Sequence, residues 1–202
     1  MVFEDQAESG AAGREEWHYS PAVSLGPLRF GMTVSEAVEA AEEFGQTKVS
    51  DCLRQHTVFS PTSKIDIHRR GAIPTPPAVT AYVSEAAGLF CLAVDAVQGP
   101  PVAYDGILLV GRGMAALERD AITYAEANDV QFRIMPEGYA APDDPGIVMR
   151  AQLVSGILRS RPLFMVPRDG AWTEWDSLPD EEYRIDGRVP GSATPPDNPW
   201  PD

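Results

Sequence analysis

The run SLGPLRFGMTVSEAVEAAEEFG at residues 24–45 constrains the fold of this chain more than any other stretch. Leu28 to Phe30 has the composition of a short strand, and Thr33 precedes Glu36 by three residues, which is the spacing of a helix capping box. Gly45 is placed to end that helix. One apolar helix face is predicted from residues that recur at helical spacing, namely Val34, Ala37, Val38, Ala41 and Phe44.

The remaining sequence predicts several short strands and one further helix. Apolar and β-branched residues predict an antiparallel hairpin over 79–94, and the turn dipeptide Asp105-Gly106 predicts a second hairpin. A helix is expected over 114–127, whereas residues 46–78 predict a long loop with a short strand at 65–68. Further strand patterns occupy 102–104, 107–110, 130–135, 147–153 and 163–166. We therefore expect an α+β fold, with a largely antiparallel sheet packed by two helices.

The negative charge of the chain lies mainly at its two ends. The net charge is −14, and residues 169–202 contain nine acidic residues against two arginines. Such a chain lacks the basic face that nucleic-acid binding requires. The ends also lack apolar periodicity. The expected organisation is a flexible N-terminus over 1–14, one domain over 15–170, an acidic-aromatic segment over 171–189 and a disordered tail over 190–202.

The sequence contains no familiar catalytic or metal-binding motif. It lacks a GxSxG nucleophile motif, a complete phosphate-binding loop and a CxxC pair. Asp66 and His68 would share one face of a strand, and Arg112 precedes the second helix. We expect no catalytic residue, no cofactor and no metal site. A small enzyme with a site assembled from these three dispersed residues is the alternative.

The acidic-aromatic segment is the best candidate for an interaction surface. Acidic side chains beside aromatic rings suit a basic protein partner. The chain is therefore predicted to be a non-enzymatic protein-binding module, such as an immunity or antitoxin-like inhibitor. A structural component that assembles as a homo-oligomer is a further alternative. The predicted contact residues are Trp172, Glu174, Trp175, Asp176, Asp180, Glu181, Glu182 and Tyr183.

Hydropathy and cysteine usage predict a soluble, cytoplasmic protein. No apolar run approaches the roughly 20 residues that a membrane-spanning helix needs. The N-terminal residues lack the basic and then apolar pattern of a secretory signal. The two cysteines, Cys52 and Cys91, are too few for a disulfide framework.

The run LGPLRFGMTVSEAV resembles the strand–turn–helix opening of a group of uncharacterised actinobacterial small α+β proteins. It also resembles small lipoprotein domains of outer-membrane assembly, whose lipidated N-terminal cysteine is missing here. The later run from Arg161-Pro162-Leu163-Phe164 to Trp172 is similar to the actinobacterial group only. The resemblance implies a small α+β scaffold and no particular activity.

Overall fold

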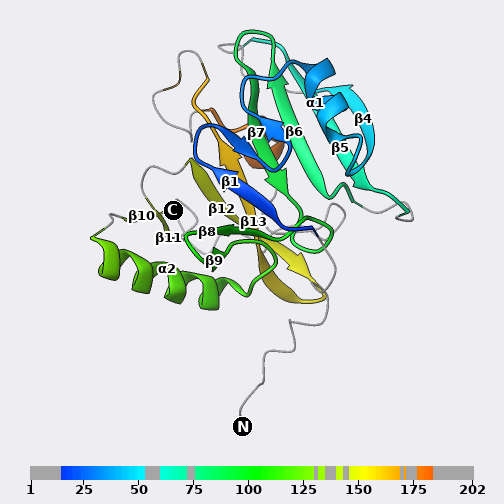
Figure 1. Ribbon diagram of the computed structural model, residues 1–202. Coiled ribbons are helices and arrows are strands. Elements are labelled where there is room, and N and C mark those ends of the chain that lie inside the picture. The colour runs from blue at the N-terminus through cyan, green and yellow to red at the C-terminus, as the bar shows by residue number, and fades with distance from the viewer. Residues whose placement is uncertain are drawn as a thin grey trace, which may run out of the picture.

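A six-stranded antiparallel sheet forms the centre of the fold (Figure 1). The structure is a computed structural model that describes residues 15–52, 60–71, 76–129, 132–134, 140–142, 146–168, 171 and 177–183. The strands run in the order β12-β13-β7-β6-β5-β4, and each neighbouring pair is antiparallel. Their bounds are β4 (Gly45–Asp51), β5 (Thr62–Arg69), β6 (Val79–Ser84), β7 (Gly88–Val94), β12 (Ile147–Val154) and β13 (Ile157–Met165).

Two of these strands lie where the sequence predicted a long loop. The predicted β6–β7 hairpin is confirmed, but the loop over 46–78 is wrong, because β4 pairs with β5 along its whole length. The strand expected at 65–68 is the centre of β5, where Ile65 and Ile67 are buried. β4 lies at the edge of the sheet, and five of its seven residues are exposed. Its sequence therefore lacks the apolar alternation by which a half-buried strand is predicted.

Gly45 belongs to this edge strand rather than to the end of the first helix. Helix α1 (Val34–Ala41) has Glu42 as its C-cap, so the predicted C-cap at Gly45 is wrong. β5 approaches Gly45 so closely that an added Cβ would lie 1.7 Å from the carbonyl oxygen of His68. Strand contact, and not the helix end, is what requires glycine at this position.

A five-stranded sheet packs beside the central one. Its order is β3-β2-β1-β8-β9, and β1 runs parallel to β8 while the other pairs are antiparallel. Asp105 and Gly106 have φ angles of 47° and 81°, which confirms the predicted tight hairpin. The strands are β1 (Trp17–Ser20), β2 (Ser24–Leu25), β3 (Leu28–Arg29), β8 (Val102–Tyr104) and β9 (Ile107–Leu108).

Both predicted helices are confirmed. The Thr33 amide donates to the Glu36 carboxylate at 2.8 Å, and the Glu36 amide donates to the Thr33 hydroxyl at 3.3 Å, which completes the capping box. Helix α2 (Met114–Asn128) buries Leu117 and two alanines, whereas Ile122 is 43% exposed. No helix among the described residues is both long and apolar enough to cross a membrane. The remaining elements are β10 (Phe132–Ile134), β11 (Ala140–Pro142) and the one-turn helix α3 (Asp180–Tyr183).

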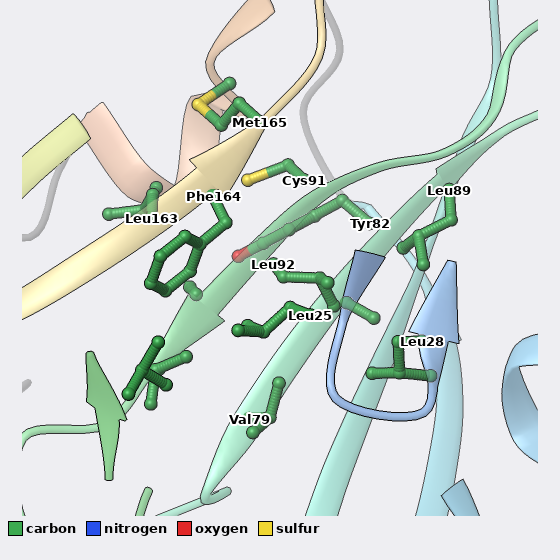
Figure 2. Packing of buried hydrophobic residues seen from close by; sticks show 14 of the residues in the cluster. Leu25, Leu28, Val79, Tyr82, Leu89, Cys91, Leu92, Leu163, Phe164 and Met165 are labelled. Atoms are coloured by element: carbon green, nitrogen blue, oxygen red, sulfur yellow. The ribbon is translucent and has the colours of Figure 1, made fainter. Parts of the chain in front are cut away.

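Different parts of the chain cover the two faces of the central sheet. On one face, Phe164 of β13 lies beside Leu92 of β7, and its ring centre is 4.5 Å from that of Tyr19 on β1. Figure 2 shows Leu25 and Leu28 from the β2–β3 hairpin in the same core. Residues 177–183 cover the opposite face, which we call the α3 face. The α3 face includes Lys64, Asp66, Tyr82, Cys91, Arg150 and Arg161.

Candidate functional site: a buried arginine–carboxylate cluster

The structure describes the last four of the eight residues predicted to contact a partner. They form α3, whereas Trp172, Glu174, Trp175 and Asp176 lie outside the described residues. Glu182, one of the predicted contact residues, is only 1% exposed, so its carboxylate does not lie at the surface of the folded protein. The reason is that Glu182 points into the sheet and meets a buried arginine there.

Arg161 holds the Glu182 carboxylate with both of its terminal nitrogens. Nη2 donates to Oε1 at 3.1 Å, and Nη1 donates to Oε2 in the same ion pair. The Tyr82 hydroxyl donates to Oε1 at 2.7 Å. This fork geometry is the one in which an arginine recognises a planar carboxylate most strongly. A carboxylate from the C-terminal segment therefore receives three hydrogen bonds from two strands of the central sheet.

The surroundings keep this carboxylate ionised. Burial by itself would raise the pKa of Glu182, but the charge of Arg161 and the hydrogen bonds from Arg161 and Tyr82 outweigh burial, and the pKa is lowered. Burial and the nearby Glu182 charge raise the pKa of Tyr82 well above its usual value, so the phenol stays a donor. Burial likewise raises the pKa of Cys91, which remains a thiol.

A second group of charges surrounds the central pair. The Lys64 ammonium lies 3.4 Å from the Asp66 carboxylate and 3.3 Å from that of Glu181. Asp66 also accepts a hydrogen bond from the Thr80 hydroxyl at 3.3 Å. Arg150 is 3% exposed, and its charge helps to lower the pKa of Glu182. We call the central ion pair, Tyr82 and the surrounding charged residues together the Arg161 cluster. Its members are Lys64, Asp66, Tyr82, Arg150, Arg161, Glu181 and Glu182.

The first residues of the segment 177–183 are held by contacts separate from those of Glu182. The Arg168 amide donates to the Ser177 hydroxyl at 2.7 Å, and Arg168 Nη2 donates to the Ser177 carbonyl at 2.8 Å. The guanidinium carbon of Arg168 lies 4.3 Å from the ring centre of Phe90. Leu178 is 1% exposed and belongs to the core. Residues 177–183 are thus held at both ends and are part of the folded body.

The residues of the enzymatic alternative are not brought together. Asp66 and His68 share a strand face as expected, but Asp66 is engaged by Lys64 and Thr80. Arg112 pairs with Asp120 and is attached to β13, which β7 and β6 separate from β5. At about 4.8 Å per strand, that separation is on the order of 14 Å. Within the described ranges, no three His, Cys, Asp or Glu side chains form a metal-binding group.

Arg161 and Tyr82 were missed as site residues because their sequence context is that of a core strand. Arg150 and Arg161 occupy paired positions on β12 and β13, each near apolar neighbours. Arginines inside two strand patterns are a usable signal, since a buried arginine requires a charged partner. The partner itself, Glu182, could not be identified by spacing along the chain.

A second surface feature lies at the start of α1. A depression of about 380 Å³ is lined by Ala22, Val23, Arg29, Phe30, Gly31, Met32 and Glu36. Val23 is 59% exposed at its edge. Four carboxylates on or directly after α1 are exposed, and none forms an ion pair with another described residue. We call the depression together with Glu36, Glu39, Glu42 and Glu43 the α1 surface.

Comparisons of the chain with protein-family models, with curated proteins and with solved structures found no match. Function is therefore inferred from the contacts, burial and charge of the described residues.

Proposed function

We propose that this chain is a non-enzymatic protein-binding module whose partner is a basic protein bound at the α1 surface. The observation that carries the proposal is the combination of exposed carboxylates with an adjoining depression. Val23, Phe30 and Met32 supply apolar contact area, while Glu36 and Glu39 supply negative charge beside it. An apolar centre within a charged rim is the usual anatomy of a protein interface.

The sign of the charge identifies the class of partner. The net charge of −14 and the exposed glutamates would steer a basic protein towards this surface, and the attraction would weaken with added salt. An immunity or antitoxin-like inhibitor that masks a basic partner is the functional class we propose. A cytoplasmic location belongs to the same proposal, and a reducing compartment agrees with the finding that Cys52 and Cys91 are buried and form no disulfide with each other.

Paired charge reversals test this proposal. Glu39→Lys with Glu43→Lys alters the α1 surface, whereas Glu118→Lys with Glu126→Lys makes the same charge change on the exposed side of α2. The wild-type chain and both variants would be used to capture binding proteins, and captured candidates would be measured by calorimetry. We expect a basic protein that binds the wild type and the α2 variant and loses at least about tenfold in affinity for the α1 variant.

Two results would contradict the proposal. Equal weakening by both pairs of reversals would indicate a response to net charge rather than to a surface. A partner that binds all three chains equally would place the interface elsewhere. The second outcome would favour the predicted contacts at Trp172, Glu174, Trp175 and Asp176, which remain a proposal.

The homo-oligomeric alternative has one observation in its favour, the exposed edge strand β4. An unpaired edge can add a strand from a second copy of the chain. Lys48, however, stands in the middle of β4, and a charged edge residue of this kind opposes such pairing. Light scattering across a concentration series separates the two functions, because only an assembly component should form a dimer or larger species by itself.

A further inference from the structure

We propose that the α3 face of the central sheet is a carboxylate-binding site. Its resident ligand is Glu182 of this chain, and its external ligand is an acidic protein segment that presents a glutamate side chain. The inference does not depend on the α1 surface and stands whether or not a basic partner binds there.

The donors of this site converge from three neighbouring regions of the sheet. Arg161 on β13 provides two parallel donors, Tyr82 on β6 provides the third, and Lys64 on β5 provides a positive charge next to them. β6 and β13 are each paired on both sides, so the positions of Tyr82 and Arg161 are fixed by strands. A carboxylate that arrives here meets a site whose donors are already oriented.

The resident ligand is attached less firmly than the site. α3 is a single turn of four residues, too short to be a stable helix by itself, and it pairs with no strand. Side-chain contacts of Glu181 and Glu182 hold it at one end, and Ser177 and Leu178 hold it at the other. A short element that is held by side chains and not by strand pairing can open locally without global unfolding. An external carboxylate reaches the donors only when residues 177–183 leave the face, so the proposal requires this local opening while Tyr82 and Arg161 stay in place.

Charge favours a replacement ligand once the segment has left. Lys64 and Arg161 would then face Asp66, the one carboxylate remaining in the Arg161 cluster. The nearby Asp95 is held in its own loop by Gln152 at 2.8 Å and by the amides of residues 97 and 98. The uncovered face is thus a basic patch in an acidic chain, and it attracts an acidic ligand.

A protein segment fits the site better than an isolated carboxylate ion. The resident ligand is recognised through its backbone as well as its carboxylate, because Arg168 donates to the carbonyl of Ser177 at 2.8 Å. Leu178 adds an apolar contact, with 1% of its surface exposed. A peptide containing a buried apolar residue and a glutamate four positions later reproduces all of these contacts.

The first test replaces the resident carboxylate by a small one. Full-length Glu182→Ala would be titrated with sodium propionate, which has the end group of a glutamate side chain, against sodium chloride at equal ionic strength. At ten times its dissociation constant, propionate should raise the melting temperature of this variant by about 3 °C. It should not do so for the wild type or for Glu181→Ala. An equal shift in all three chains, or none in Glu182→Ala, would overturn the proposal.

The second test uses the wild-type chain and does not depend on the folding of a variant. Labelled SLPDEEY, the sequence of residues 177–183, and the control SLPDEQY would be compared by fluorescence anisotropy. The glutamate peptide should bind at least about tenfold more tightly, because a hydrogen bond to a charged group is worth that much or more. If Glu182→Ala folds, it should bind SLPDEEY more tightly than the wild type does. Equal affinity for the two peptides, or binding of neither, would refute a carboxylate site.

Discussion

Arg161 and Glu182 lie twenty-one residues apart in the chain and form a buried ion pair that joins the central sheet to α3. Both terminal nitrogens of the arginine contact the carboxylate, and the side chains are 10% and 1% exposed. Taking two charges out of water is costly, so the pair fixes the position of α3 more than it adds net stability. Removing only one of the two side chains should be strongly destabilising, because it leaves the other charge buried without its partner.

Neutralising Glu182 should therefore destabilise the protein strongly. Glu182→Gln leaves Arg161 buried without a counter-charge, and about 3–5 kcal/mol of unfolding free energy should be lost. The matched control is Glu181→Gln, whose side chain is 29% exposed and whose pair with Lys64 is worth at most about 1 kcal/mol. Urea unfolding of the three chains at pH 7 measures both effects. Similar small losses in the two variants would mean that Glu182 is solvated.

The same carboxylate should make stability depend on acid. The pKa of Glu182 is lowered in the folded protein, so its contribution is complete above the unfolded value of about 4.3 and disappears as the pH falls through the lower folded value. The difference in stability between wild type and Glu182→Gln should be constant above about pH 5 and should narrow below it. Hydrogen bonds with Thr33 also lower the pKa of Glu36. Because Glu36 titrates in both proteins, its contribution cancels in the difference between their stabilities. A difference that stays constant down to pH 3 would contradict this assignment.

The capping box of α1 should be measurable separately. Thr33→Ala removes the hydroxyl that accepts from the Glu36 amide and should cost about 1 kcal/mol. Thr33→Ser keeps the hydroxyl and should cost much less. Thermal unfolding of the two variants measures both losses of stability. Equal losses would show that the threonine methyl group, rather than the capping hydroxyl, stabilises the helix.

Gly45 should tolerate no side chain. Gly45→Ala would place a methyl group 1.7 Å from the His68 carbonyl oxygen, so β4 must shift, at a cost of about 1–3 kcal/mol. Gly113→Ala is the control, since an added Cβ there meets nothing within 4 Å. Gly113 is the N-cap of α2, where alanine is less favourable than glycine, so this variant should lose less than about 1 kcal/mol. Chemical denaturation of both variants tests the close approach of β4 and β5. An unchanged Gly45→Ala protein would mean that the two strands are not paired at this point.

Local patterns in the sequence predicted much of the architecture. The α1 capping box, the β6–β7 hairpin and the Asp105-Gly106 turn each depend on residues close together in the chain, and all three are confirmed. β4 was missed because an exposed edge strand has no apolar alternation. The first half of β13 was missed because Arg159, Ser160 and Arg161 interrupt its apolar pattern.

The candidate site was much harder to predict than the fold. The acidic and aromatic residues of 172–183 predicted an interaction surface there. The main contact of Glu182, however, is with Arg161 on β13, twenty-one residues earlier in the chain. Which acidic residue of Asp180, Glu181 and Glu182 is buried depends on how one short turn meets the sheet. Neither hydrophobic periodicity nor motif spacing in the sequence identifies the buried acidic residue.

A double-mutant cycle between Arg161 and Glu182 tests the central claim most directly. Arg161→Met, Glu182→Leu and the double variant would be unfolded in urea at pH 7. Each single change leaves a buried charge without its partner, whereas the double change leaves neither charge, so the double variant should lose at least about 2 kcal/mol less than the sum of the single losses. Additivity within about 0.5 kcal/mol would show that the two residues do not interact and that α3 is not held by this pair.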